Sequence, residues 1–511
     1  MNEPSAVFVQ AEPSDPLTTA VRSGPTWSAA GIAVTWSDGT VEVSARTLSR
    51  VAIRWSEPLP AEALIVGDAW ERSYGDLQWR HQQPERLLPW YFLSHDPRTG
   101  RSTGAGVDVQ PNAFCSWTVD ADGFTLWLDL RNGGGPTQLN GRTLTAATVR
   151  RFEDAGTPWL TLHAAVATMS SRLPARPEPV PVVGANNWYY AYGENFDEKA
   201  VLKDAMTVVE LADGHPVKPF SVVDDGWYPG GIASGGPWDA GTPEVFDDMA
   251  GTASAIKQLG ARPGLWFRPL RVREPARALD PSYPEVLDLV RTDLQRFKDW
   301  GFELVKHDFS TYDMFGRWGP SMVSGLTDEG RQFHDQTRTS AEIVLAFYRE
   351  IRLAAEGVVL IGCNTVGHLA AGLVDVQRTG DDTSGRDWER TRRMGVNTLA
   401  FRLPQHHRFF TVDADCVPCT PQTPWELNQR FLDLVARSGT ALFVSVDPVA
   451  RTEQSDRALS EGIRLALSGG DGPGLEPADW LVNTTPNSWR SGAETIHYDW
   501  SRPWGADPVS P

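Results

Sequence analysis

Acidic and basic side chains end several short apolar segments in the middle of this sequence. Lys306 and Asp308 end the segment ELVKHDF (303–309). Because side chains alternate along a β-strand, these two would face one side, while His307 would face the other side, toward neighbouring helices. A lysine beside a carboxylate favours the ionised form. The spacing therefore predicts one of two things. Asp308 is either an ionised nucleophile at the end of its strand or part of a structural ion pair with Lys306.

Two adjacent acids, Asp224 and Asp225, end the segment FSVVDD (220–225), and Trp227 follows closely. Carboxylates accept hydrogen bonds from sugar hydroxyls, and an indole can pack on a sugar ring. The alternative is an exposed acidic pair in a loop. Trp266, in PGLWFRP (263–269), could face either a pocket or the core, and its spacing does not decide between them.

Further polar residues end other apolar segments: Arg268, Cys363, Asn364, Arg378, Asp381 and Asp382. No cluster of His, Cys or Asp has the spacing of metal ligands, so we expect neither a metal nor a cofactor. Glycoside hydrolysis needs two carboxylates on either side of the scissile bond. One attacks the anomeric carbon, and the other, held protonated, donates to the leaving oxygen.

The composition limits the partners of the 511-residue chain. A formal net charge of −18 argues against nucleic acid and anionic membranes, and 21 Trp favour carbohydrate binding or a bulky β core. We therefore expect a small neutral oligosaccharide as the partner. The four cysteines are too few for a disulfide framework, and Cys416 and Cys419 form a lone CxxC that is more typical of an incidental pair than of a zinc site. With no basic and apolar leader visible, a cytoplasmic location is expected.

The first third of the chain has the pattern of a β-sandwich. Short alternating segments occur between about residues 26 and 170 and include GIAVTWSDGTVEVSAR, LSRVAIRW, GFTLWLDLRNG and PWLTLHAAVATM. The proline-rich segment LPARPEPVP (173–181) then predicts a stiff linker. We place an N-terminal β-sandwich domain at 1–175.

The next segments predict a (β/α)8 TIM barrel over 176–457, because short apolar segments alternate with amphipathic ones. The candidate strands are 181–185, 220–225, 263–269, 303–309, 358–363, 374–380, 408–414 and 441–447, and the candidate helices include 197–211, 245–259, 283–300 and 340–355. A doubly wound sheet is the main alternative, but no GxGxxG follows the first strand. Residues 458–511 predict a short C-terminal β domain. In such a barrel the site lies at the carboxyl ends of the strands.

Six motifs, in order, resemble the α-galactosidases of glycoside hydrolase family 36 and their clan relatives: NNWYYAYG (186–193), VVDDGW (222–227), RPGLWFRP (262–269), LVKHDF (304–309), IGCN (361–364) and RTGDDT (378–383). The resemblance covers roughly residues 180–450 and extends to the order of domains. It implies a double-displacement mechanism that retains the α configuration. In that mechanism Asp308 matches the nucleophile and Asp382 the general acid/base, with Asp381 as its rival.

The resemblance also implies a sugar-binding set. Asp224 and Asp225 fall where the family binds the 4- and 6-hydroxyls of galactose, and the rest of the expected set is Trp188, Trp266, Lys306, Cys363, Arg378 and Asp381. The segment GCNTVGH (362–368) departs from the family pattern. An N-terminal domain of this family can lend a loop to the pocket, so Trp70 or Trp79, in the Trp-, Arg- and acid-rich segment GDAWERSYGDLQWR (67–80), is expected at the leaving-group side. The alternative is a sandwich-core or interdomain contact.

The leading function is hydrolysis of terminal, non-reducing α-galactosides. An α-N-acetylgalactosaminidase, another α-hexosidase or a transglycosylase on the same barrel is the alternative enzyme. A non-catalytic carbohydrate-binding protein is the alternative from another class. The oligomeric state stays open.

Overall fold

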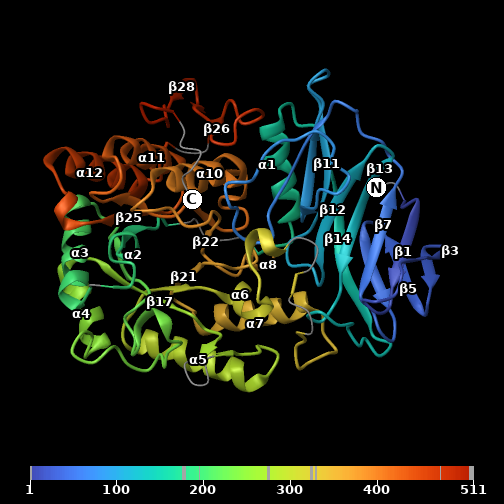
Figure 1. Cartoon of the computed structure of the whole chain (residues 1–511), viewed down its shortest axis with the longest axis horizontal. Coiled ribbons are helices and arrows are strands. Elements are labelled where there is room, and N and C mark those ends of the chain that lie inside the picture. The colour runs from blue at the N-terminus through green and yellow to red at the C-terminus, as the bar shows by residue number, and fades with distance from the viewer. Residues whose placement is uncertain are drawn as a thin grey trace.

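The computed structural model describes residues 3–174, 180–194, 196–272, 277–322, 326–327, 331–471 and 474–505. It confirms the predicted fold: antiparallel sheets form an N-terminal sandwich, a parallel barrel follows, and a small antiparallel sheet ends the chain. The sandwich and the barrel lie side by side, and the C-terminal strands lie above α10 and α11 in the view of Figure 1. Residues 175–179 of the expected linker are outside the described residues.

The sandwich consists of a six-stranded sheet in the order β2-β1-β7-β13-β12-β9 and an eight-stranded sheet in the order β3-β4-β5-β6-β14-β11-β10-β8. Its strands are β1 (Ala6–Gln10), β2 (Thr18–Thr19), β3 (Val21–Ser23), β4 (Thr26–Ala29), β5 (Ile32–Ser37), β6 (Thr40–Ser44), β7 (Arg50–Trp55), β8 (Leu64–Gly67), β9 (Leu88–Pro89), β10 (Tyr91–His95), β11 (Ser102–Val107), β12 (Phe114–Asp120), β13 (Gly123–Asp129) and β14 (Thr143–Phe152). Aromatic side chains fill the core between the sheets, where Trp55 packs on Trp36, Trp117 and Phe124.

One segment predicted as a strand is a helix. PWLTLHAAVATM forms α1 (Pro158–Met169), with the Thr157 side chain capping its N-terminus and a proline in its first turn. The prediction was wrong because the buried residues recur at helical spacing: Trp159, Leu162, Ala165, Val166 and Met169. The helix packs against β11 and β14 of the sandwich.

The barrel contains every candidate strand, in the sheet order β23-β22-β21-β20-β17-β16-β15-β25-β24. These strands are β15 (Val183–Asn186), β16 (Phe220–Val223), β17 (Arg262–Phe267), β20 (Leu304–His307), β21 (Val359–Gly362), β22 (Val376–Arg378), β23 (Thr411–Asp413), β24 (Val417–Cys419) and β25 (Leu442–Val446). A parallel bridge between Asp413 and Ala441 joins the β23 and β25 sides of the ring. A hairpin of β18 (Arg271–Val272) and β19 (Arg277–Ala278) projects after β17.

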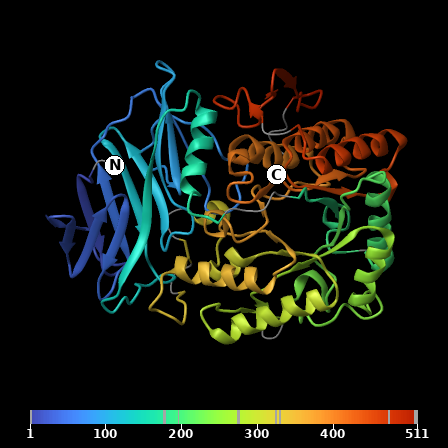
Figure 2. The same ribbon diagram turned by 180° about the vertical axis from the view of Figure 1, so that it is seen from behind.

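The longer helices of the barrel cover its outside (Figures 1 and 2), and short ones, such as the helix that carries Trp188, lie at the carboxyl ends of its strands. They are α2 (Trp188–Ala191), α3 (Glu198–Leu211), α4 (Met249–Leu259), α5 (Pro284–Asp299), α6 (Ser310–Phe315), α7 (Ser340–Ala354), α8 (Gly367–Ala370), α9 (Trp388–Thr391), α10 (Asn397–Arg402), α11 (Trp425–Ser438) and α12 (Glu453–Leu467), with short turns η1 (Gly231–Ala233), η2 (Gly319–Met322), η3 (Arg392–Val396), η4 (Leu403–Gln405) and η5 (Pro448–Ala450). Side-chain caps explain where the predicted helices begin, since Asp197, Asp248 and Thr339 each accept a hydrogen bond from the first turn.

The C-terminal sheet contains β26 (Leu475–Pro477), β27 (Ser488–Ser491) and β28 (Glu494–His497). It is anchored to the barrel by tryptophans: Trp388 Nε1 donates to the carbonyl oxygen of Trp500 at 3.0 Å. Helix α12 crosses position 458, where the sequence pattern changes, and the sheet itself starts at Leu475. Within the described parts of the chain, no helix is both long and apolar enough to cross a membrane.

Candidate active site

A cavity of about 310 Å³ lies at the carboxyl ends of the barrel strands, where the sequence predicted a site. Eight of the ten predicted residues line it: Trp188, Asp224, Asp225, Trp266, Lys306, Asp308, Asp381 and Asp382. Six further residues complete the lining: Arg72, Tyr74, Tyr189, Phe309, Trp318 and Arg390. The lining is therefore rich in carboxylates, cations and aromatic rings.

Lys306 and Asp224 form a buried ion pair at the floor of the cavity. Lys306 Nζ lies 2.7 Å from Asp224 Oδ2, which also accepts a hydrogen bond from Asn186 Nδ2 at 2.5 Å. Burial alone lowers the pKa of Lys306, but the neighbouring groups, Asp224 foremost and Asp308 among them, together outweigh burial and raise the pKa above its ordinary value. Lys306 is thus a fixed cation in the cavity.

His307 points away from the cavity, as the alternation along β20 predicts. Its ring lies 6.1 Å from the ring of Tyr348 on α7, and burial lowers its pKa to about 4. The neutral imidazole therefore belongs to the packing between strand and helix, and it is separate from the carboxylates on the other side of the strand.

Two donors hold the carboxylate of Asp308. Trp266 Nε1 donates to Oδ2 at 3.2 Å, and the backbone N–H of Phe309 donates to Oδ1 at 2.6 Å. Phe309 has a φ of +61°, a left-handed conformation that is costly for a bulky residue and marks a strained turn directly after Asp308. Trp266 therefore faces the cavity and orients Asp308.

Asp224 and Asp225 are both buried, which rules out the exposed acidic pair. Tyr228 donates its hydroxyl to Asp225 Oδ1 at 2.7 Å. Burial raises the pKa of Asp225 to about 8, and the neighbouring charges of Asp224 and Asp308 add to the rise. At neutral pH Asp225 is thus mostly a protonated carboxyl that can donate as well as accept a hydrogen bond.

Trp227 does not line the cavity, so the expectation that it packs on a bound ring is wrong. Its side chain is fully buried, and its Nε1 donates to the carbonyl oxygen of Trp266 at 2.9 Å. The ring packs on Trp238 and Phe297 in the layer between strands and helices.

Two arginines grip one oxygen of Asp382. Arg378 Nη2 lies 3.0 Å and Arg72 Nη1 3.1 Å from Asp382 Oδ1. Burial alone raises the pKa of Asp382, but Arg378 and Arg72 outweigh it and lower the pKa to about 2. Without substrate this carboxyl is therefore ionised, whereas the sequence analysis expected it to be protonated. That expectation did not include Arg72, which comes from a distant segment of the chain.

Asp381 is held at both oxygens. Arg72 Nη2 lies 3.2 Å from its Oδ1, and Arg390 Nη2 lies 2.6 Å from its Oδ2. Burial and the charge of Asp382 raise its pKa despite these cations. Its side chain is 11% exposed, against 37% for Asp382. Among the described residues none donates to Asp382 Oδ2, so that oxygen is available to a ligand.

Arg378 and Cys363 lie beneath the lining. Arg378 Nη1 is 3.0 Å from Asp415 Oδ1 and 3.9 Å from Cys363 Sγ. Asp415 also accepts hydrogen bonds from the Tyr189 hydroxyl and from the backbone N–H of Thr383. This layer fixes the loop that carries Asp381 and Asp382.

The N-terminal domain reaches the cavity through Arg72 and Tyr74. Trp70 and Trp79 do not line it: Trp70 packs on Trp90, and Trp79 packs on Trp480. The loop does lend residues to this cavity, but they are Arg72 and Tyr74, while Trp70 lines a neighbouring cavity and Trp79 lies in an interdomain contact. The signal available in the sequence was the high content of Trp, Arg and acidic residues in the segment 67–80.

Glu71 anchors this loop on the barrel. Its Oε1 accepts hydrogen bonds from the Tyr74 hydroxyl at 2.6 Å and from the backbone N–H of Gly319 at 2.7 Å, and its Oε2 accepts one from Asn364 Nδ2. The position of Arg72 is thus fixed from both domains.

The chemistry of the cavity rests on carboxylates. Among the described residues, no group of three or more His, Cys, Asp or Glu is arranged to hold a metal ion. All four cysteines are buried and free, including the CxxC pair. The cavity offers a fixed carboxylate in Asp308, a second one in Asp382 with a free oxygen, and polar groups that suit hydroxyls.

No protein-family model matches this sequence, and no curated protein sequence matches it. Solved structures do match the fold. An α-galactosidase from Thermus thermophilus in complex with p-nitrophenyl α-D-galactopyranoside is 17% identical, with a TM-score of 0.59 over 91% of this chain and 97% of that one. A family 36 α-galactosidase variant from Geobacillus stearothermophilus in complex with 1-deoxygalactonojirimycin is 14% identical, with a TM-score of 0.59 over 91% and 72%. The resemblance seen in the motifs is therefore confirmed as a shared fold.

Proposed function

We propose that this chain is a retaining α-glycosidase that hydrolyses terminal, non-reducing α-D-galactosides by double displacement. One observation carries the proposal: Asp308 and Asp382, which follow different strands of the barrel, line one cavity together with the buried Lys306–Asp224 pair. The fold shared with α-galactosidases solved with galactosides supports the choice of sugar.

Asp308 is the proposed nucleophile. Its carboxylate is oriented by Trp266 and by the backbone of Phe309, so little reorganisation is needed before attack on the anomeric carbon. The attack forms a glycosyl ester and breaks the bond to the leaving oxygen. Lys306 and Asp224 then suit the hydroxyls of the bound sugar, because one donates and the other accepts hydrogen bonds.

Asp382 is the proposed acid/base. Its free Oδ2 and larger exposure favour it over Asp381, whose two oxygens are both held by arginines. It donates a proton to the leaving oxygen and later takes one from the water that opens the glycosyl ester. Because its pKa is about 2 without substrate, it must take up that proton as substrate binds.

The test is hydrolysis of aryl α-glycosides by the wild type and by Asp308→Ala. We expect turnover of the α-galactoside and a fall of kcat by at least about a thousandfold in the variant. If the protein hydrolyses an aryl α-N-acetylgalactosaminide or α-glucoside but not the galactoside, the proposed mechanism stands and the proposed substrate is wrong. Binding of galactose without turnover of any of the three would favour a non-catalytic sugar-binding protein.

A further inference from the structure

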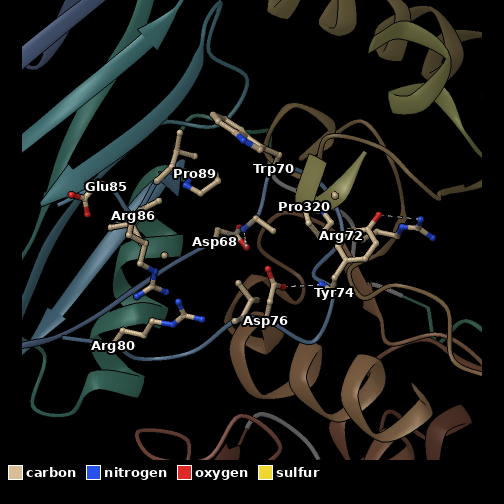
Figure 3. A pocket seen from close by; sticks show the side chains of 16 residues that line it. Asp68, Trp70, Arg72, Tyr74, Asp76, Arg80, Glu85, Arg86, Pro89 and Pro320 are labelled. Atoms are coloured by element: carbon tan, nitrogen blue, oxygen red, sulfur yellow. Dashed lines mark hydrogen bonds between the residues drawn. The ribbon is translucent and has the colours of Figure 1, made fainter. Parts of the chain in front are cut away.

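A second cavity, of about 580 Å³, lies between the sandwich and the barrel, next to the active site. Figure 3 shows that most of its wall comes from the segment 67–89, with Pro320 of the barrel beside Arg72 and Tyr74. It shares Arg72 and Tyr74 with the catalytic cavity, and Gly319 and Pro320 follow directly on Trp318, which lines the catalytic cavity. The two cavities are therefore direct neighbours, with Arg72 and Tyr74 in the lining of both.

Two arginines on the wall lack a carboxylate partner. Arg86 donates through Nη1 to the carbonyl oxygen of Ile65 at 2.8 Å and through Nη2 to that of Gln78 at 2.9 Å, which fixes its guanidinium. Among the described residues, neither Arg80 nor Arg86 forms an ion pair. Their guanidinium groups lie together in Figure 3, and burial together with the charge of Arg80 lowers the pKa of Arg86 to about 10.

The acids of the same wall are engaged elsewhere or point away. Asp68 pairs with Arg402 at 2.6 Å, and Asp76 accepts a hydrogen bond from the backbone N–H of Tyr74 at 2.9 Å. The carboxylate of Glu85 points away from the two guanidinium groups in Figure 3. The charge of Asp76 acts favourably on Arg86, but less strongly than Arg80 acts unfavourably. The two neighbouring cations therefore repel each other on balance, and an anion placed between them removes that repulsion.

We propose that the second cavity binds an anionic group, a carboxylate or a phosphate, on the leaving-group part of the substrate. The inference rests on the proposed function and narrows its substrate class from neutral galactosides to galactosides with an acidic leaving group. Arg80 and Arg86 donate to the anion, and the apolar wall of Trp70, Leu88 and Pro89 packs on the rest of the leaving group. Since the chain carries a net charge of −18, attraction of an anion must come from this local pair.

The test compares two substrates that differ in one group. Melibiitol and melibionate both carry α-galactose on an open-chain hexose derivative, and they end in a neutral CH2OH and in a carboxylate, respectively. We expect kcat/KM at low salt to be about tenfold higher for melibionate, and the ratio to fall to about one in Arg80→Gln/Arg86→Gln. Arg98→Gln, which removes an exposed arginine of the same domain, is the control and should keep the ratio.

The outcomes separate this inference from the proposed function. If the wild type hydrolyses an aryl α-galactoside but has equal kcat/KM for melibionate and melibiitol, the anion site is overturned and the proposed glycosidase function stands. If no galactoside is hydrolysed, the thermal midpoint of unfolding tests the anion site. A midpoint that melibionate raises more than melibiitol does, in the wild type but not in Arg80→Gln/Arg86→Gln, supports the site. Equal midpoints with the two compounds overturn it. Competition by inorganic phosphate beyond that of chloride at equal ionic strength distinguishes a phosphate site from a carboxylate site.

Discussion

Arg72 Nη1 lies 3.1 Å from Asp382 Oδ1, although 310 residues of chain separate the two. The same guanidinium contacts Asp381, so one side chain of the sandwich holds both acids of a barrel loop. The N-terminal domain is therefore part of the cavity itself, and the ionisation of the proposed acid/base depends on it.

Replacing Arg72 should change catalysis more than binding. Arg72→Met removes one of the two cations that lower the pKa of Asp382, so that pKa should rise and the loop should lose a support. We expect kcat/KM for an aryl α-galactoside to fall on the order of a hundredfold, which corresponds to roughly 3 kcal/mol, with a changed pH profile. Arg98→Met serves as the control. An unchanged profile in Arg72→Met would separate the N-terminal domain from the ionisation of Asp382.

The roles of Asp381 and Asp382 can be separated by chemical rescue. In a variant that lacks the acid/base, a small anion such as azide can replace water at the glycosyl ester, because it needs no base. We expect azide to restore turnover of an aryl α-galactoside in Asp382→Ala, with an α-galactosyl azide as product, and to leave Asp381→Ala unaffected. If azide restores turnover in Asp381→Ala and not in Asp382→Ala, Asp381 is the acid/base and Asp382 is not.

The leaving group should govern the pH dependence. With a pKa of about 2, the protonated fraction of Asp382 in the free enzyme grows about tenfold for each unit that the pH falls toward that value. Poor leaving groups need this proton, so kcat/KM for melibiose should rise from pH 7 to pH 5. A dinitrophenyl galactoside needs no proton and should show no such rise. The same slope for both substrates would contradict proton donation by an ionised Asp382.

Asp225 should make the protein less stable as the pH rises. Its pKa of about 8 in the folded state exceeds the unfolded value of about 3.9, so the folded state binds the proton more tightly. The stability that the protonated Asp225 contributes to the folded state is fully present below about pH 4 and is lost between about pH 4 and 8. Relative to the wild type, Asp225→Asn should therefore gain thermal stability progressively across this window.

The exposed substitution Glu356→Gln provides the comparison for Asp225→Asn. We expect the thermal midpoint of Asp225→Asn to rise above that of the wild type by a few degrees at pH 8 and by less at pH 5, whereas Glu356→Gln should show no comparable change. A difference that is independent of pH would show that Asp225 is not protonated in the folded state.

The sequence predicted what depends on local periodicity and on the order of strands. Lys306 and Asp308 share a face because side chains alternate, and both do line the cavity. Asp224 and Asp382 join them because parallel strands all end at the same mouth of a barrel.

The remaining features depend on contacts between distant segments. No local pattern places Arg72 beside Asp382, since a folded loop of another domain carries it there. Trp227 and Trp266 have the same residue type, and only packing sends one into the core and the other to the cavity. The prediction of a strand at 158–169 was wrong for a different reason. A short apolar segment fits both the two-residue period of a strand and the 3.6-residue period of a helix until its buried face is known.

The central claim is that Asp308 attacks the sugar, and covalent trapping tests it most directly. A 2-deoxy-2-fluoro-α-galactosyl fluoride or a related activated donor slows hydrolysis of the glycosyl ester more than its formation. Mass spectrometry of the digested protein should find one added fluorogalactosyl group, on the peptide that contains Asp308, and none in Asp308→Asn. A label on any other carboxylate, or turnover of an aryl α-galactoside that persists in Asp308→Asn, would contradict the account.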